Sequence, residues 1–305
     1  MHWLFILLVV VSGSAFAGAT QWVDFELDQG YITIPIKVHG QAGRAMLDSG
    51  ANINGINSDF VLANPDKFSQ SGKIEVEGAF GKSKRSTYNN VPVELYGAEF
   101  RLDSMVEMRD FKPLVLLGNA FFNLNIVQLD YPNQRLRLID RDSVNLQKLK
   151  NIDMKVDKRL QMPIVKIRLN KEKTIWALLD TGNTGGMFVE RYVVKRTDWL
   201  EKYPAGGGTF DGVTKTATVE NFYLPEIQFG PFGIENVLTT VAAEGESFIP
   251  VSRSTAKTGS HIKSKNVKGI VGYEVFKHFV LTIDYKTGRM HIGIPDDLSA
   301  TESGT

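Results

Sequence analysis

One pattern occurs twice in this chain, once in each half. An apolar stretch that ends in Asp, a hydroxyl residue and Gly reads M-L-D-S-G at residues 46–50 and L-L-D-T-G at residues 178–182. Each copy follows a segment of alternating apolar residues that contains a proline, at residues 31–38 and 160–167. Such alternation is typical of half-buried strands. Because a repeated sequence folds into repeated units, this feature predicts two similar, strand-rich halves.

The correspondence between the halves continues beyond the two Asp residues. Five later residues of the first half recur in the second half, each after the same interval along the chain. They are Gly118, Phe122, Asp130, Tyr131 and Arg135, which correspond to Gly272, Phe276, Asp284, Tyr285 and Arg289. We therefore predict an N-terminal lobe at residues 18–142, a linker at 143–155 that forms a strand or short helix, and a C-terminal lobe at 156–305.

Both lobes are expected to be all-β. Short runs of β-branched and aromatic residues alternate with turn residues, and the chain contains 28 glycines and 11 prolines. This composition is typical of a β protein with many turns. Helical patterns are sparse, and we expect short helices only within residues 190–203 and at 119–122 and 273–276.

The first 17 residues are predicted to be a signal peptide. An apolar run from Trp3 to Val11 precedes Ala15-Phe16-Ala17, which indicates cleavage after Ala17. The run is too short to span a bilayer, which takes about 20 apolar residues. No lysine or arginine precedes this run, although a signal peptide normally begins with a positively charged region. A retained membrane anchor is therefore the alternative. The chain has no cysteine, and we expect it in the periplasm or, second, secreted from the cell.

Charge and motif content exclude several functions. The chain carries 35 basic and 34 acidic residues, for a net charge of +1, which provides no field to attract nucleic acid or an anionic membrane. Its five histidines form no HExxH pattern or pair at helical spacing, and no GxSxG elbow occurs. These patterns would signal metal-dependent or serine-nucleophile chemistry. We therefore expect no metal, no cofactor, no nucleic acid partner and no stable membrane span.

The two Asp turns provide a chemical reason for the repeat. A single Asp-Ser-Gly or Asp-Thr-Gly is a common turn, and two ordinary turns are the alternative reading. Two carboxyls that face each other share one proton, so the pair can act as base and acid in one step. Glycine lets the turns approach closely, and the hydroxyls can brace them. The candidates are Asp48 and Asp180 as the catalytic pair, with Ser49, Gly50, Thr181 and Gly182 as support.

These motifs resemble those of aspartic peptidases of the pepsin and retropepsin type. In that family each lobe carries a hydrophobic-hydrophobic-Asp-[Ser/Thr]-Gly turn and, later, a hydrophobic-hydrophobic-Gly element beneath it. Here the later elements are L-L-G at 116–118 and I-V-G at 270–272. The resemblance implies a bilobal aspartic-protease fold of two fused retropepsin-like lobes, with Asp48 and Asp180 as catalytic pair in the cleft between them. A monomer is expected, because both halves of the site lie in one chain.

The same resemblance implies a β-hairpin flap after each Asp turn. One candidate is residues 74–88, and the other is residues 206–216; an ordinary surface hairpin is the alternative for both. The flap residues expected to bind substrate are Gly78, Ala79, Phe80, Gly81, Phe210 and Gly212. A basic segment at 250–268 is expected to be a solvated loop, with substrate binding as its alternative.

The resemblance implies an aspartic endopeptidase that hydrolyses peptide or protein substrates. A peptide-binding protein of weak or no activity on the same fold is the alternative, and a processing enzyme for a single partner protein is a third reading. Pepsin-like relatives carry a hydroxyl donor after Asp-Thr-Gly, whereas residue 51 is Ala. We therefore expect the acid limb of the pH–activity profile to lie at a higher pH than in pepsins. Asn183 carries an amide that could reach Asp180, so we expect Asp180 to carry the charge and Asp48 the proton.

Overall fold

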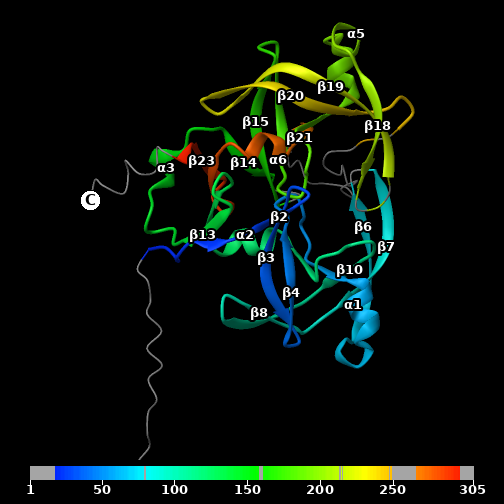
Figure 1. Cartoon of the computed structure of the whole chain (residues 1–305), viewed down its shortest axis with the longest axis vertical. Coiled ribbons are helices and arrows are strands. Elements are labelled where there is room, and N and C mark those ends of the chain that lie inside the picture. Colours follow the sequence, from blue (N-terminus) through cyan, green and yellow to red (C-terminus); the bar gives the residue numbers. More distant parts are fainter. Residues whose placement is uncertain are drawn as a thin grey trace, which may run out of the picture.

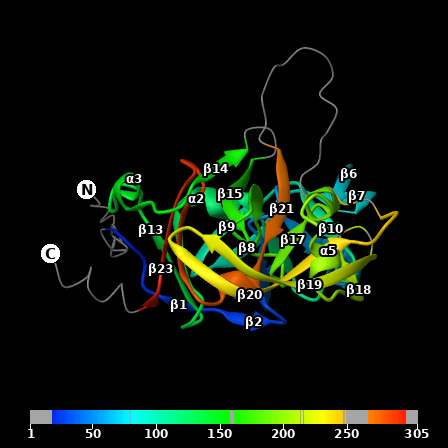
Figure 2. The same ribbon diagram turned by 90° about the horizontal axis from the view of Figure 1, so that it is seen from above.

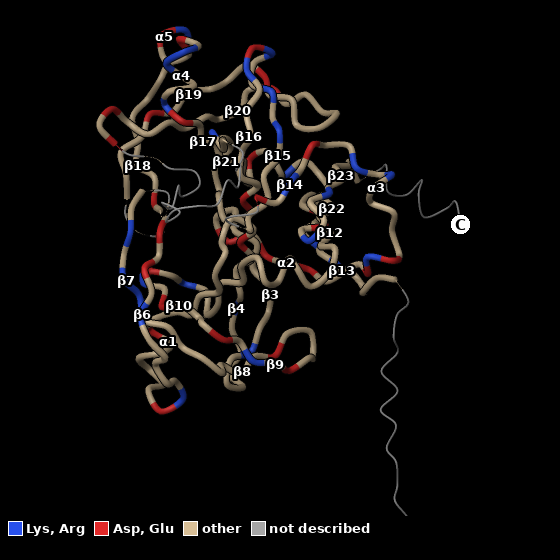
Figure 3. Tube along the Cα trace, turned by 180° about the vertical axis from the view of Figure 1, so that it is seen from behind, with Lys and Arg blue, Asp and Glu red and all other residues tan. Residues whose placement is uncertain are grey.

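The computed structural model describes residues 18–295, except 79, 158–160, 213, 215, 247 and 249–265. Over these residues the chain is mostly β-sheet with a few short helices, which confirms the all-β class (Figure 1). The predicted signal peptide and most of the basic segment at 250–268 lie outside the described residues. Figure 3 shows acidic and basic residues interspersed over both halves, in line with the net charge of +1.

The N-terminal half forms a ten-stranded sheet. Its strands are β2 (Glu26–Asp28), β3 (Tyr31–Val38), β4 (Gln41–Leu47), β5 (Gly55–Asn57), β6 (Gln70–Gly78), β7 (Gly81–Tyr88), β8 (Val91–Leu95), β9 (Ala98–Leu102), β10 (Met105–Met108) and β11 (Val115–Leu117). In β3 the expected alternation is clear, because Ile34, Ile36 and Val38 are buried while Pro35 and Lys37 are exposed.

The C-terminal half forms an eight-stranded sheet. Its strands are β14 (Met154–Asp157), β15 (Met162–Leu169), β16 (Lys173–Leu179), β17 (Met187–Val189), β18 (Gly206–Asp211), β19 (Thr216–Phe229), β20 (Phe232–Ala242) and β21 (Val267–Val271). A third, five-stranded sheet takes strands from both halves. It contains β1 (Val23–Asp24), β12 (Ile126–Asp130), β13 (Arg135–Ile139), β22 (Val280–Asp284) and β23 (Arg289–Gly293).

The helices are short and mostly lie where the sequence predicts them. They are α1 (Ser58–Ala63), the 3-10 turn η1 (Pro65–Lys67), α2 (Asn119–Leu124), α3 (Leu146–Leu149), α4 (Arg191–Lys195), α5 (Trp199–Lys202) and α6 (Tyr273–Phe276). The predicted helix at 190–203 is two helices, because Asp198 between them has a left-handed backbone, with φ of 56°. Helix α1 was not predicted, although Asn57 caps it by accepting a hydrogen bond from the Phe60 N–H at 2.7 Å.

The two large sheets share one central strand order. In the first sheet β10, β5, β11, β4 and β3 are successive neighbours, and in the second β20, β17, β21, β16 and β15 are. In both sheets the strand before the late glycine lies parallel to the strand before the Asp turn. The sequence repeat is therefore a structural repeat. The halves differ where β19, a single strand of 14 residues, replaces β7 and β8.

The five-stranded sheet joins the halves about an approximate twofold axis. Strands β12 and β22 pair antiparallel, and Gln128 lies opposite Thr282, its counterpart in the repeat. The Gln128 amide donates a buried hydrogen bond of 2.8 Å to the Thr282 hydroxyl. Figures 1 and 2 show this sheet on one side of the molecule and the β6–β7 and β18–β19 hairpins on the opposite side. Equivalent residues that lie close to this axis, such as Gln128 and Thr282, therefore face each other across the two halves.

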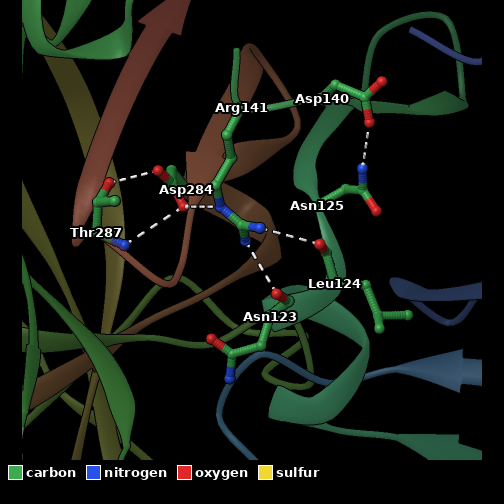
Figure 4. Close-up of polar contacts among 7 residues, drawn as sticks. All are labelled: Asn123, Leu124, Asn125, Asp140, Arg141, Asp284 and Thr287. Carbon is green, nitrogen blue, oxygen red and sulfur yellow. Dashed lines mark hydrogen bonds and ion pairs between the residues drawn. The ribbon is translucent and has the colours of Figure 1, made fainter. Parts of the chain in front are cut away.

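Arg141 ties the two halves together beside this sheet (Figure 4). Its guanidinium donates to the Asp284 carboxylate at 3.0 Å and to the carbonyls of Leu124 and Asn123 at 3.0 and 2.9 Å. The two carbonyls lie at the end of α2, where helix carbonyls lack partners. Asp284 also accepts from the Thr287 hydroxyl and N–H. One side chain therefore joins the end of an N-terminal helix to a C-terminal strand pair.

Candidate active site

The two Asp turns meet where the large sheets approach each other. Asp48 directly follows β4 and Asp180 directly follows β16. The Asp48 N–H donates to the Leu117 carbonyl at 3.0 Å, and the Asp180 N–H donates to the Val271 carbonyl at 3.1 Å. Each Asp is thus held by the strand that precedes the late glycine of its own half.

Four buried hydrogen bonds brace one turn against the other. The Ser49 N–H donates to the Thr181 hydroxyl at 2.9 Å, and the Thr181 N–H donates to the Ser49 hydroxyl at 3.0 Å. The Ser49 hydroxyl in turn donates to the Leu179 carbonyl at 2.7 Å, and the Thr181 hydroxyl to the Leu47 carbonyl at 2.9 Å. Each hydroxyl both accepts and donates across the interface, so neither turn can shift without breaking bonds to the other.

The glycines of the turns leave room for the opposite carboxyl. A Cβ atom on Gly50 would lie 2.5 Å from Cγ of Asp180, and one on Gly182 would lie 2.6 Å from Cγ of Asp48. The glycine N–H groups hold the carboxyl of their own turn, from Gly50 to Asp48 at 2.8 Å and from Gly182 to Asp180 at 2.9 Å. The two carboxyls therefore face each other, and only glycine fits at either position.

The late glycines fit against the loops that follow the Asp turns. A Cβ atom on Gly118 would lie 2.2 Å from the Ile53 carbonyl oxygen, and one on Gly272 would lie 2.3 Å from the Asn183 carbonyl oxygen. Any larger residue would push the loop away from the strand beneath it. These glycines therefore allow the loop after each Asp turn to pack closely against the strand beneath it.

The carboxyl pair holds a proton above the ordinary titration range of Asp. Asp48 is buried and Asp180 is half-buried. Burial raises the pKa of both carboxyls, and the negative charge of Asp48 raises the pKa of Asp180 further, well above its usual range. Hydrogen bonds from Asp180 and from two backbone N–H groups partly offset this effect at Asp48. The pair titrates as a unit.

The Asn183 amide was expected to reach Asp180 and to stabilise its charged form. The Asn183 side-chain oxygen accepts from the Gly185 N–H at 3.1 Å. Its amide nitrogen lies against Gly272, 2.6 Å from the site of an added Cβ atom. The amide is therefore turned toward the late glycine, and no hydrogen bond from it to Asp180 is present among the described residues. Which carboxyl of the pair carries the charge stays a prediction.

Two tyrosines beside the turns break the symmetry of the site. The Tyr285 hydroxyl donates a buried hydrogen bond of 2.9 Å to the Ser49 carbonyl. Its counterpart Tyr131 has a buried hydroxyl that makes no hydrogen bond within the described part of the chain. The sequence repeat identifies both residues, but only the packing shows that one hydroxyl supports a turn. The sequence patterns also did not identify Tyr31. Burial raises the pKa of its hydroxyl, and the negative charges of Asp48 and Asp180 raise it further.

Tyr285→Phe is expected to destabilise the protein by about 1–3 kcal/mol, because it leaves the buried Ser49 carbonyl without this donor. Tyr131→Phe is the matched control, since it removes a hydroxyl that has no such bond among the described residues, and it is expected to leave the stability unchanged or to raise it. Urea unfolding of both variants measures the difference. Equal losses in the two variants would show that the hydrogen bond of Tyr285 contributes nothing specific.

The first flap candidate forms a hairpin. Strands β6 and β7 pair antiparallel up to Gly78 and Gly81, which lie opposite each other at the tip. Between them, Phe80 is buried although it stands in the turn, and Ala79 lies outside the described residues. The hairpin thus lies where the resemblance implies it, and the Phe80 side chain in its turn is buried.

The second flap candidate is also a hairpin, formed by β18 and β19. Phe210 lies opposite Ala217 within it, and Gly212 directly follows β18. The tips of the two hairpins meet, because a Cβ atom on Gly78 would lie 3.0 Å from the Thr214 hydroxyl oxygen. The Thr214 hydroxyl is buried without a hydrogen bond among the described residues, so its contact with Gly78 is steric.

No group of three His, Cys, Asp or Glu residues in the described part of the chain is placed to hold a metal ion. No helix in these residues is long and apolar enough to cross a membrane. Comparison with protein-family models gives no match, and comparison with curated proteins gives no significant relative. The carboxyl pair on its braced turns is thus the chemical feature from which a function can be argued.

Proposed function

We propose that this protein is an aspartic endopeptidase with a bilobal aspartic-protease fold, in which two retropepsin-like lobes share one site. The observation that carries the proposal is the pair of facing carboxyls, each on a turn that occupies the same place in a repeated half. Two ordinary surface turns would have no reason to exchange four buried hydrogen bonds. A raised pKa caused by burial and a like charge is typical of acid–base pairs in active sites.

The pair can carry out both proton transfers of peptide hydrolysis. Ionised Asp48 takes a proton from a water molecule, whose oxygen attacks the scissile carbonyl carbon while protonated Asp180 donates to the carbonyl oxygen. Asp48 then gives its proton to the leaving nitrogen as the C–N bond breaks. Asp180 recovers a proton from a hydroxyl of the tetrahedral intermediate, which restores the starting state. The half-buried position of Asp180 is consistent with entry of water from its side.

The substrate in this proposal is an extended peptide that lies between the two hairpins. Strand edges near the cleft can pair with its backbone and provide affinity that does not depend on sequence. The chain acts as a monomer, because it contains both Asp turns. Residues 1–17 act as a cleaved signal peptide, and the mature protein works in the periplasm or outside the cell.

A peptide-binding protein of weak activity on the same fold is the second candidate. The hairpin tips touch and Phe80 is buried, so in either proposal a peptide must displace the tips before it reaches the carboxyl pair, and weak activity toward generic peptides would follow. A processing enzyme for one partner protein would behave in the same way toward generic peptides. The two proposals differ in whether any peptide is cleaved once it has entered.

Digestion of a diverse peptide library by the purified mature protein tests the proposal. Cleavage is expected within extended, apolar stretches, and mass spectrometry of the products identifies the bonds. The Asp48→Asn protein, purified in the same way, controls for contaminating proteases. Identical product patterns from the two proteins between about pH 4 and pH 8 would reject an aspartic mechanism and leave the peptide-binding candidate.

Activity and stability should respond to pH in opposite ways. The active form has one ionised carboxyl, and because burial raises the pKa of Asp48, the acid limb of kcat/KM is expected above the ordinary Asp value of about 3.9. The stability of the fold depends on pH because the folded pair retains protons at pH values at which the unfolded chain has lost them. The free energy of unfolding contributed by the pair is therefore greatest below the ordinary pKa and falls as pH rises toward the raised pKa values.

Urea unfolding at acid and neutral pH measures this linkage. Other carboxyls titrate over the same range, so the quantity to compare is the difference between the wild-type protein and Asp48→Asn. The variant is expected to gain stability relative to wild type as pH rises from about 3.5 to 7.5, because it lacks the buried charge. A difference that does not change with pH would mean that burial does not shift the pair.

A further inference from the structure

A tyrosine from the C-terminal half supports the Asp turn of the N-terminal half. Tyr285 directly follows β22 and is fully buried. Its ring stacks on that of Phe122, with the centroids 5.8 Å apart and the planes at 30°. Its hydroxyl donates a hydrogen bond of 2.9 Å to the Ser49 carbonyl. Both the ring and the hydroxyl are therefore held by residues of the opposite half.

The accepting carbonyl belongs to the peptide unit that holds the Asp48 carboxyl. The Ser49 carbonyl and the Gly50 N–H are parts of one peptide, and this N–H donates to Asp48 Oδ1 at 2.8 Å. A donor at the carbonyl oxygen polarises the peptide, so that its N–H becomes a stronger donor. A stronger bond to a carboxylate favours the ionised form. The same N–H has the smallest of the effects that shift the pKa of Asp180. The Tyr285 hydroxyl therefore acts mainly on Asp48, through a single peptide unit.

The other Asp turn is built in the same way but receives no such support from its own tyrosine. The Gly182 N–H donates to the Asp180 carboxyl at 2.9 Å. Tyr131 is the counterpart of Tyr285 in the repeat, yet its buried hydroxyl makes no hydrogen bond within the described part of the chain. The two tyrosines thus support the two carboxyls unequally.

The packing around the two tyrosines also differs. The rings of Phe25 and Tyr273 flank Tyr131, with centroids 5.9 and 6.1 Å from its own. Asn119 occupies the position that corresponds to Tyr273 in the repeat, so no equivalent ring lies beside Tyr285. The asymmetry therefore comes from differences between the two halves of the sequence and not from the strand order that they share.

We propose that Tyr285 is a positioning residue of the carboxyl pair, which stabilises the singly ionised pair through the Ser49–Gly50 peptide and directs its negative charge to Asp48. The importance of this charge for cleavage rests on the proposed function, whereas its location does not. In the proposed mechanism the ionised carboxylate takes the proton from water. Tyr285 thereby selects which carboxyl acts as the base, and it extends the singly ionised range to lower pH.

Three tyrosines are affected by the charge of the pair, and all three remain neutral while it titrates. Burial raises the pKa of Tyr31, Tyr131 and Tyr285, and charge on the pair raises it further. Asp211 adds to the effect on Tyr31, and Tyr273 adds to that on Tyr131. Beyond the pair itself, no charged side chain of the described residues shifts the pKa of either carboxyl. The Tyr285 hydroxyl is therefore a hydrogen-bond donor throughout this titration.

NMR titration locates the charge without reference to cleavage. The protein is labelled with ¹³C at its aspartate carboxyls, and the two signals of interest are identified by their absence in Asp48→Asn and Asp180→Asn. In the wild-type protein, the Asp48 signal is expected to show the larger change in the first titration step of the pair.

Tyr285→Phe is expected to raise the midpoint of this first step by about 0.3–0.5 pH unit, or about two- to threefold in the ionisation constant, because the Gly50 N–H becomes a weaker donor. Tyr131→Phe is the matched control and should leave the midpoint within about 0.1 unit of wild type, since its hydroxyl polarises no peptide. If peptides are cleaved, the acid limb of kcat/KM is expected to move together with the midpoint.

A second substitution separates hydrogen bonding from packing. A tyrosine with one fluorine next to its hydroxyl, incorporated in place of Tyr285, keeps the bond to Ser49 and is a stronger donor, because fluorine withdraws electrons. It is expected to lower the midpoint, opposite to Tyr285→Phe, and it serves as the test if Tyr285→Phe does not fold. A structural role alone would move the midpoint in the same direction with both substitutions or with neither, and either result would overturn the inference.

The remaining outcomes distinguish the inference from the proposed function. Opposite shifts in a protein that cleaves no peptide would leave the inference standing without the proposed function. Cleavage by the wild-type protein, with midpoints that do not move, would leave the proposed function standing alone. A first titration step that belongs mainly to Asp180 would overturn the location of the charge.

Discussion

Asp48→Asn and Asp180→Asn are each expected to lower the rate of peptide cleavage by about 10⁴-fold. Loss of either carboxyl removes one of the two proton transfers, and acid–base groups contribute about 10²–10⁴-fold each. The fold should persist, because the four bonds of the brace involve Ser49, Thr181 and backbone groups and not the carboxyls. Cleavage of the best library peptide, together with circular dichroism of each variant, measures both effects.

The control for these variants is Asp66→Asn, which neutralises an exposed carboxyl in η1. It should retain wild-type turnover, since it lies outside the turns that hold the pair. Retention of near-wild-type turnover by only one of the two catalytic candidates would contradict a paired mechanism and point to a single carboxylate. Retention by both would place the chemistry elsewhere in the molecule.

Thr181→Val is expected to lower the free energy of unfolding by about 2–6 kcal/mol, the largest stability effect that we predict. The two side chains have nearly the same shape, but Val leaves the Ser49 N–H without its acceptor and the Leu47 carbonyl without its donor. Each buried group that loses its partner costs about 1–3 kcal/mol. The joint between the halves should loosen as a result, and cleavage should fall with stability. Urea unfolding monitored by tryptophan fluorescence provides the measurement.

Thr181→Ser is the matched control, because it keeps the hydroxyl and removes only a methyl group. It is expected to retain most of the stability and the cleavage activity. Ser49→Ala is the mirror variant and strands the Thr181 N–H and the Leu179 carbonyl in the same way. If Thr181→Val were no less stable than Thr181→Ser, the brace would be a contact of little energetic weight.

Local sequence patterns determined much of this protein. Alternating apolar residues predict β3 and most other strands, because the two-residue period of a strand is a property of the backbone itself. The repeated spacing predicts two similar halves, and the resemblance to aspartic peptidases implies the position of the hairpins. The repeated spacing also indicates Asp48 and Asp180 as a candidate pair, and in the structure their two turns are in contact. These features depend on residues close in the chain, or on comparison of one half with the other.

Tertiary structure alone decided what breaks the symmetry. Tyr131 and Tyr285 are equivalent in the repeat, yet only the hydroxyl of Tyr285 reaches a backbone carbonyl of the Asp turns. The Phe80 ring leaves its own half and lies among rings of the other. The pKa values of both carboxyls are raised, because they depend on burial and, for Asp180, on the charge of a carboxyl in the opposite half. Such contacts join residues far apart in sequence, and their energies depend on packing and desolvation that local patterns do not encode.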